Sequence, residues 1–211
     1  MSYETYPEIV DAVREELNRS DLTDPQIASF IRICELRAYR SLRIPAMEVK
    51  VALPVVPAPE GEADGVSYFD PPERWLESIS LTNEDGRPIE FVSQQEFRKR
   101  INTHSVRFTV FTREADKFLL WPNSGIENVV MYYYQMPLRG NTTDNTAPAI
   151  YKDVGEALFF GAVSEGWRFF REPDKHATYL QMYAETLNQV NDQYRQSDVS
   201  GSTLITKNPY R

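Results

Sequence analysis

The chain has 211 residues, is 41% hydrophobic and carries a formal net charge of −8, so it can bury a core as one large domain or two small ones. No segment approaches the roughly 20 apolar residues that cross a membrane, no secretory signal opens the chain, and a single cysteine excludes an intrachain disulfide or a thiolate metal cluster. Without a predicted membrane span or secretory signal, we expect a soluble protein made in a cytoplasm. An acidic chain also lacks the clustered lysine and arginine that bind nucleic-acid phosphates, so its surface is expected to repel DNA.

Two helices are predicted at the start of the chain. Thr5 and Glu8 have the spacing of a capping box, and apolar residues then recur with helical periodicity to about Arg19. A second helix is expected to begin after Thr23 and to end at Pro45.

The middle of the chain is rich in predicted strands. Residues 83–86 end in the Asp-Gly pair of a hairpin turn, and residues 89–92 are expected to return as the partner of the strand before that turn. Ser93 and Glu96 have capping-box spacing and open a short helix that ends near Ile101. The strands are expected at residues 49–53, 75–81, 89–92, 107–112, 117–121 and 128–135.

Two further helices are predicted near the end of the chain. Helical periodicity resumes at Ala149 and breaks at Pro173, and a last helix covers residues 174–196. Three glycines lie inside the first of these helices, where each costs about 1 kcal/mol relative to alanine, a cost that close helix–helix contact can offset. The polar residues after 196 have no periodicity and are expected to order only on a partner. The three glycines are Gly155, Gly161 and Gly166.

This order of elements predicts an α+β fold. The N- and C-terminal helix pairs form a four-helix bundle, and an antiparallel β domain is inserted between them. The expected boundaries are residues 1–46 with 149–197 for the helical bundle domain, 47–148 for the inserted β domain and 198–211 for an extended C-terminal tail.

The sequence has no recognisable active-site pattern. His104 and His176 are the only histidines and are expected at the surface, and no nucleophile-elbow motif surrounds Ser105. No spacing of His, Cys, Asp or Glu matches a metal site, no glycine-rich loop matches a phosphate site, and Cys34 lies on an apolar helix face. We therefore expect no catalytic, metal-binding or cofactor-binding residues, although two of the 31 acidic residues can still converge as a hydrolytic carboxylate pair.

Arg37, Arg40 and Arg43 form a basic segment on the second helix. They are either a strip for phosphate groups or partners in ion pairs with carboxylates such as Glu35 and Glu48, within the helical domain or across a subunit boundary. The interleaved apolar residues and the nearby carboxylates favour ion pairs.

Two motifs mark the N-terminal helices. Residues 17–22 read L-x-R-x-D-L, and residues 35–43 read E-x-R-x-x-R-x-L-R. These motifs resemble the turn and second helix of the head-to-tail adaptor, or tail tubular protein A-like, family of short-tailed bacteriophages. The tyrosines at 132–133, the helix pair from 151 and the tail from about 200 also match that family, whereas residues 69–75 replace its usual Leu-Pro-x-Asp segment. The motif positions are Leu17, Arg19, Asp21, Leu22, Glu35, Arg37, Arg40, Leu42 and Arg43.

The resemblance implies a structural virion protein, made in the host cytoplasm, that is not an enzyme and needs no cofactor or membrane. It implies a homo-oligomeric ring of about twelve subunits at the portal–tail junction, contacting the portal protein and the tail nozzle or tail fibre proteins. Such a ring would help to retain double-stranded DNA and to pass it without binding it specifically. The residues it suggests for subunit or portal contacts are Arg19, Asp21, Glu35, Arg37, Arg40, Arg43, Ser202, Leu204, Ile205 and Tyr210.

Two other functions stay open at this point. The β domain can instead be a virion module that binds a host glycan or receptor, with Trp75, Trp121 and the tyrosines at 132–134 as stacking surfaces. Neighbouring residues of a strand point to opposite faces, so only part of that tyrosine run can share one surface. A hydrolase that uses scattered acidic residues is the other alternative.

Overall fold

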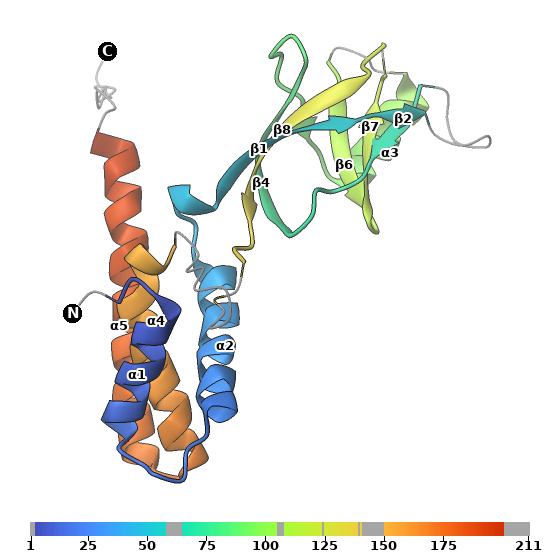
Figure 1. The fold of residues 1–211 in the computed structure, drawn as a ribbon. Helices are drawn as coiled ribbons and strands as arrows, with labels where there is room; N and C mark the ends of the chain where they lie inside the picture. Colours follow the sequence, from blue (N-terminus) through green and yellow to red (C-terminus); the bar gives the residue numbers. More distant parts are fainter. Residues whose placement is uncertain are drawn as a thin grey trace, which may run out of the picture. The chain divides into compact units, whose positions relative to one another are not determined.

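The computed structural model describes residues 3–57, 65–104, 108–123, 125–138, 140 and 150–200, with side chains to residue 195. The chain divides into two compact units, one made of Met1–Met47 with Pro137–Arg211 and the other of Glu48–Met136 (Figure 1). We call them the helical unit and the β unit. The predicted α+β class, with helix pairs at both ends of the chain and antiparallel sheets between them, is confirmed.

The helical unit is built around one central helix. Helix α4 packs against each of the other three long helices, and twelve of its 19 residues are buried, which is why its sequence is apolar on nearly every side. Thr5 caps α1 through a capping box with Glu8, and the Gln26 side chain accepts from the Thr23 amide at the start of α2. The helices are α1 (Tyr6–Leu17), α2 (Asp24–Ser41), α4 (Tyr151–Phe169) and α5 (Pro173–Ser200), with a 3-10 turn η1 (Pro45–Met47) after α2.

The glycines of α4 lie where other parts of the unit approach its backbone most closely. A Cβ on Gly161 would lie 2.8 Å from Cys34 Sγ and 2.9 Å from Tyr183 Cδ2, so no side chain fits between α2, α4 and α5 there. Gly155 meets the backbone of Tyr3, and Gly166 meets the side chain of Leu17. The close contact predicted at these glycines is confirmed between helices at Gly161 and Gly166, whereas Gly155 meets the segment before α1.

The β unit contains two sheets and one helix. The three-stranded sheet has the order β1-β8-β4, and the five-stranded sheet has the order β2-β3-β7-β6-β5. Every pairing is antiparallel except the short parallel one between β5 and β6. The elements are β1 (Glu48–Pro54), β2 (Val56–Pro57), β3 (Ser67–Phe69), β4 (Trp75–Asn83), β5 (Glu90–Phe91), α3 (Gln94–Thr103), β6 (Val110–Glu114), β7 (Lys117–Trp121) and β8 (Asn128–Gln135).

Two apolar cores hold the β unit together, one on each face of the five-stranded sheet. Alternate strand residues point to opposite faces, so neighbouring residues of one strand enter different cores. Phe111 and Leu120 pack between the two sheets, whereas Val110 and Trp121 pack with Phe97 beneath α3.

The predicted hairpin after β4 forms at its turn and in a short stretch of pairing beyond it, where Thr82 bridges to Pro88. The Gly86 amide donates to the Asn83 carbonyl at 3.0 Å, as expected, and Ile89 still bonds to Leu81. The prediction that residues 89–92 pair along the preceding strand is confirmed only at Ile89, because the next residues form β5 and pair in parallel with β6 in the other sheet.

Three predicted boundaries also shift. Helix α2 ends at Ser41, four residues before Pro45, and β6 begins at Val110 rather than at residue 107. Helix α5 runs past its expected end at residue 196 to Ser200, since no proline or glycine interrupts it before Gly201. Residues 201–211 lie outside the described residues.

Candidate functional site

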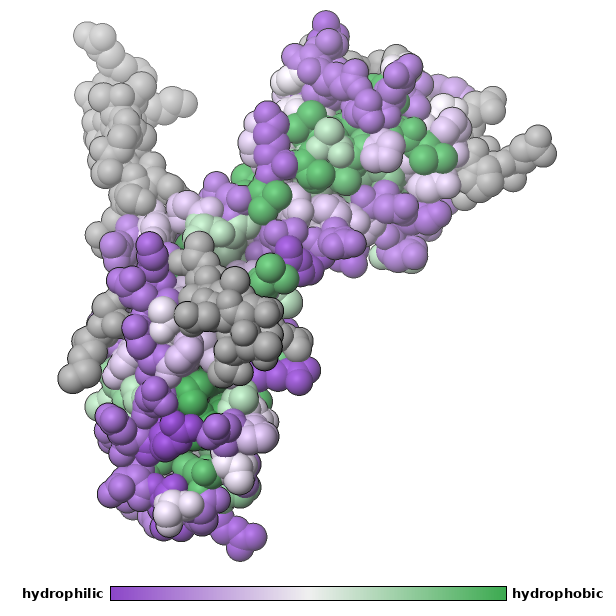
Figure 2. All heavy atoms as spheres, in the orientation of Figure 1, coloured by the Kyte–Doolittle hydropathy of each residue, from purple (hydrophilic) through white to green (hydrophobic). Residues whose placement is uncertain are grey.

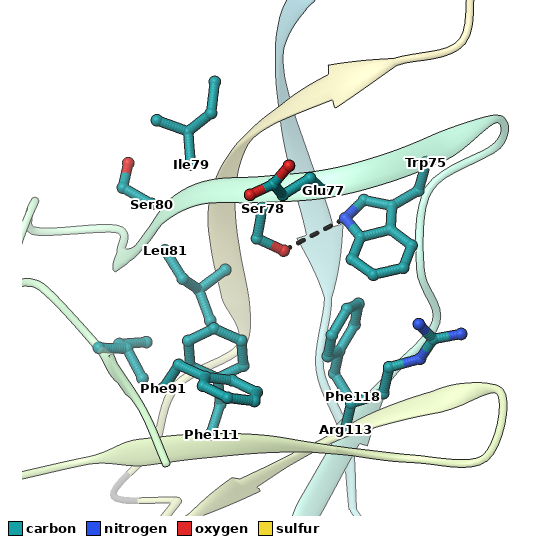
Figure 3. Close-up of a pocket in the computed structure, with 11 residues that line it drawn as sticks. Trp75, Glu77, Ser78, Ile79, Ser80, Leu81, Phe91, Phe111, Arg113 and Phe118 are labelled. Atoms are coloured by element: carbon teal, nitrogen blue, oxygen red, sulfur yellow. Dashed lines mark hydrogen bonds between the residues drawn. The ribbon is translucent and has the colours of Figure 1, made fainter. Parts of the chain in front are cut away.

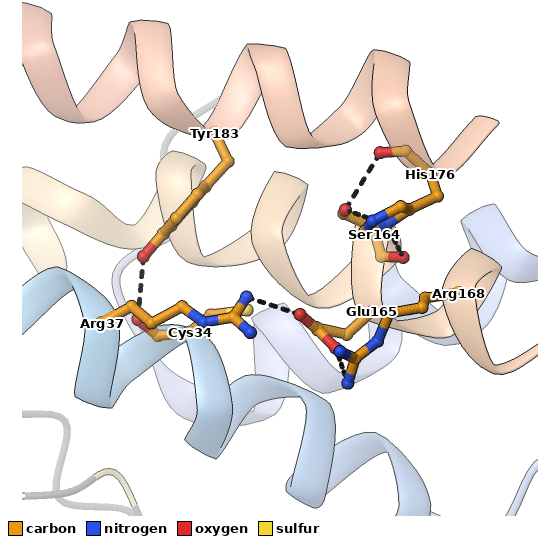
Figure 4. Close-up of polar contacts among 7 residues, drawn as sticks. All are labelled: Cys34, Arg37, Ser164, Glu165, Arg168, His176 and Tyr183. Carbon is orange, nitrogen blue, oxygen red and sulfur yellow. Dashed lines mark hydrogen bonds and ion pairs between the residues drawn. The ribbon is translucent and has the colours of Figure 1, made fainter. Parts of the chain in front are cut away.

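A buried carboxylate joins the predicted position Arg37 to a second arginine, Arg168, which was not predicted (Figure 4). Glu165 on α4 is 2% exposed, and its Oε1 lies 2.6 Å from an Arg37 guanidinium nitrogen on α2. Its Oε2 lies 2.5 Å from Arg168, close enough for an ion pair but not aligned as a hydrogen bond. The prediction that Arg37 forms an ion pair is confirmed, and the contact lies within the helical unit. Glu165 itself was not predicted.

Glu35 is a core residue rather than a surface residue. It is 1% exposed, and its Oε1 accepts from the Tyr151 hydroxyl, from the Gly140 amide at 3.0 Å and from the Tyr39 hydroxyl at 3.4 Å. Burial, followed by the charge of Glu35, raises the pKa of both tyrosines. An ion pair was expected for Glu35, but the structure gives it neutral hydrogen-bond donors instead, from α2, from α4 and from the segment before α4.

The other charged motif residues that the structure describes lie at or near the surface, whereas the motif leucines Leu17 and Leu42 are buried in the helical unit. Arg19 Nε lies 3.4 Å from Asp21 Oδ1, and its guanidinium stacks 4.4 Å from the centre of the Phe170 ring. Arg43 donates to the carbonyl groups of Arg40 and Leu42, which ends α2. Arg40 itself is exposed. Ser202, Leu204, Ile205 and Tyr210 lie outside the described residues.

The two histidines differ in their surroundings. His104 is exposed at the C-cap of α3, as predicted, and Ser105 lies outside the described residues. His176 is half-buried, which corrects its predicted surface position. Its Nδ1 lies 2.8 Å from the Ser164 hydroxyl, which also donates to the His176 carbonyl at 3.1 Å (Figure 4). Ser164 is 1% exposed, so this pair joins α4 to α5 and presents no nucleophile to a substrate.

The β unit contains a cavity of about 510 Å³ between the two sheets (Figure 3). Trp75, Phe111 and Phe118 form much of its wall, and the Arg113 guanidinium lies 4.7 Å from the centre of the Trp75 ring. Phe91, at its rim, is 59% exposed. Figure 2 shows other hydrophobic side chains reaching the surface of the β unit on the face in view.

Part of the predicted stacking surface is unsuited to sugars. Trp121 and Tyr133 are 4% and 2% exposed and belong to the two cores. Tyr132 is 39% exposed on the opposite face of β8, beneath the ammonium group of Lys50. Only Trp75 lines the cavity among these predicted rings.

The described residues contain no cluster of three His, Cys, Asp or Glu side chains that could hold a metal ion. Within the same part of the chain, no helix is both long and apolar enough to span a bilayer.

The helical unit is expected to lose stability as the pH rises from about 9 to 12, because several of its groups have raised pKa values. Burial raises the pKa of Cys34 to about 12, and burial with a hydrogen bond to Glu16 raises that of Tyr179 to about 12. In the unfolded chain these groups lose protons at about 8.5 and 10. The folded form therefore holds more protons, and the free energy of unfolding falls as the pH rises through this window. Urea unfolding followed by far-UV circular dichroism at pH 7, 9 and 10.5 measures this; an unchanged midpoint would contradict it.

Comparison with known proteins places these features in a family. A family model described as SU10 adaptor protein matches residues 4–206, which is nearly all of the 211 residues. No curated protein matches the chain. The match spans both units, including Glu35, Arg37 and Glu165.

Proposed function

Because the chain belongs to the SU10 adaptor protein family, a phage head-to-tail adaptor family, we propose that it forms the ring between the portal and the tail nozzle of a tailed phage. As a member of that family it is a structural phage protein and a virion component. The proposed ring has about twelve subunits, contacts the portal protein above and tail nozzle or fibre proteins below, and lets DNA pass through its centre. The family match is the observation that carries this proposal.

Two physical features support it. The net charge of −8 repels DNA at long range, which suits a channel that holds DNA without binding it. The helical unit is tied together by the buried hydrogen bonds of Glu35 to Tyr151, Tyr39 and Gly140, and a buried, hydrogen-bonded network favours one rigid arrangement. A subunit that repeats around a ring needs such a fixed shape.

Negative-stain imaging of the full chain with the purified portal of its own phage tests the proposal. A second ring, coaxial with the portal, is the expected result, and its symmetry gives the number of subunits. Bare portals at a saturating excess of the chain would contradict the adaptor function.

Deletion of residues 201–211 is expected to leave the fold intact and to weaken attachment to the portal. The deletion begins after the last residue of α5, so the helices keep their packing, while Leu204, Ile205 and Tyr210 are lost as contacts. We expect an unchanged far-UV spectrum and a fall in decorated portals of at least about tenfold, which corresponds to 1.4 kcal/mol of binding free energy. A full-length variant with Leu204→Ser and Ile205→Ser separates the loss of these two apolar contacts from the shortening of the chain. Normal decoration by the deleted chain would remove the tail from the proposal.

A second candidate function is receptor or glycan binding by the β unit. The cavity beside Trp75 favours it, because an aromatic ring and the Arg113 guanidinium lie together at an open surface. A glycan array probed with the full chain and with Trp75→Ala tests it. Binding that the substitution removes would support this function, whereas no binding to any sugar on the array would leave the adaptor function alone.

A further inference from the structure

An acidic line runs along the outward face of α1. Glu8, Asp11 and Glu15 are exposed and lie on one side of α1 at spacings of three and four residues, and the exposed Glu4 lies just before the N-cap of that helix. Asp11 forms an ion pair with Arg14 of the same helix. The opposite side of α1 carries the buried residues that pack in the helical unit. We call Glu4, Glu8, Asp11 and Glu15 the acidic stripe.

A basic line runs along the outward face of α2. Arg32 and Arg40 are exposed and lie eight residues apart, about two helical turns. Leu36 lies between them and is half-buried, and Arg37 stays 46% exposed beside its ion pair with Glu165. Within the described part of the chain, neither Arg32 nor Arg40 forms an ion pair. We call Arg32, Leu36, Arg37 and Arg40 the basic stripe.

The two stripes are opposite in charge and similar in length. The helical carboxylates from Glu8 to Glu15 extend over about 10.5 Å, and the arginines from Arg32 to Arg40 over about 12 Å, at 1.5 Å per helical residue. Within one chain α1 and α2 contact each other and both pack on α4, and Arg14 of α1 forms an ion pair with Asp24 of α2. In the described part of the chain, no ion pair joins the acidic stripe to the basic stripe.

We propose that the acidic stripe of one copy binds the basic stripe of the next copy, and that this is the subunit contact of the ring. Two different, complementary patches on one subunit make a head-to-tail contact, which is the kind that closes into a ring. Leu36 supplies an apolar centre to the contact, and the charges around it set its register. The inference rests on the proposed ring and names the surface that builds it.

Charge-changing substitutions on each stripe test this contact. Glu4→Lys with Glu15→Lys brings the formal charge of the acidic stripe from −4 to 0 and leaves Glu8, which caps α1, in place. Arg32→Glu with Arg40→Glu reverses the basic stripe and leaves the Arg37–Glu165 pair. Each variant alone is expected to form at least about tenfold fewer rings on the phage's own portal, since the first variant removes the attraction between the facing stripes and the second turns it into repulsion.

An equal mixture of the two variants is expected to restore the rings. In the mixture, an altered acidic stripe can face a reversed basic stripe, and an unchanged pair can form at the next contact, so the two variants alternate around the ring. Glu185→Lys with Asp192→Lys, at exposed positions of α5, changes the net charge by as much as the first variant and should leave rings unaffected. Far-UV circular dichroism checks that all variants fold.

The other outcomes separate the two proposals. Rings at the normal level from either variant alone, or none from the mixture, would overturn the stripe contact while the adaptor function stands. Reversed arginines that weaken DNA binding in a gel-shift assay but leave rings intact would assign the basic stripe to phosphate groups. Wild-type chains that leave portals bare would overturn the ring and this contact together.

Discussion

Replacing Glu35 with alanine is expected to lower the free energy of unfolding of the helical unit by about 3 kcal/mol or more. The substitution removes one acceptor from three donors at once, namely the Tyr151 hydroxyl, the Tyr39 hydroxyl and the Gly140 amide. A buried donor left without an acceptor costs about 1–3 kcal/mol. Urea unfolding followed by far-UV circular dichroism, which reports mainly on helices, measures the change.

Two further variants separate loss of hydrogen bonds from loss of charge. Glu35→Gln keeps an acceptor oxygen of the same reach, so we expect it to retain more than half of the stability that alanine loses. Glu185→Ala removes a carboxylate from an exposed position of α5 and should change the unfolding free energy by no more than about 0.5 kcal/mol. If Glu35→Ala unfolds at the same urea concentration as the wild type, the three contacts do not stabilise the unit.

Replacing Gly161 with valine is expected to destabilise the helical unit by about 1–3 kcal/mol, the usual cost of overpacking a filled core. Its first side-chain carbon alone would meet Cys34 Sγ at 2.8 Å and Tyr183 Cδ2 at 2.9 Å, so α2 or α5 must move away from α4. The same unfolding measurement, made beside Ala184→Val on the exposed side of α5, separates the clash from the weaker helix propensity of valine.

A double substitution identifies the atom that causes the clash. Cys34→Ala removes the sulfur nearest to the new side chain, so Gly161→Val should cost less in that background than in the wild type. Equal costs in the two backgrounds would show that the thiol of Cys34 does not limit the packing of α2 on α4.

Local chemistry is the reason that much of the fold could be predicted. The first residues of α1 and α3 could be predicted from the N-caps Thr5 and Ser93, because each N-cap depends only on residues up to three positions away. Strand β8 could be placed at residues 128–135 because its alternating burial is a local property of that segment. The three glycines of α4 also indicated close packing, because few other reasons favour glycine inside a helix.

Contacts between distant residues could not be predicted in the same way. The parallel pairing of β5 with β6 depends on which sheet the chain joins after Ile89, and no local sequence pattern predicts which sheet that is. Glu35 has motif spacing with Arg37, which suggested ion pairs, but its strongest partner, Tyr151, lies 116 residues away. Ser164 inside an apolar helix was the available sign of the His176 contact, since a buried hydroxyl needs a partner.

The ends of the β unit lie side by side, which affects how the protein can evolve. The unit begins with Glu48 on β1 and closes just after β8, and Glu48 is paired with Tyr134 in the same ladder, so the entry and exit are about one strand spacing, roughly 4.8 Å, apart. An insertion whose ends meet this closely can be exchanged for another, or shortened to a turn, with little change in loop-closure entropy for the surrounding fold. Related phages could therefore diversify this module to suit different tails while one helical scaffold is inherited unchanged.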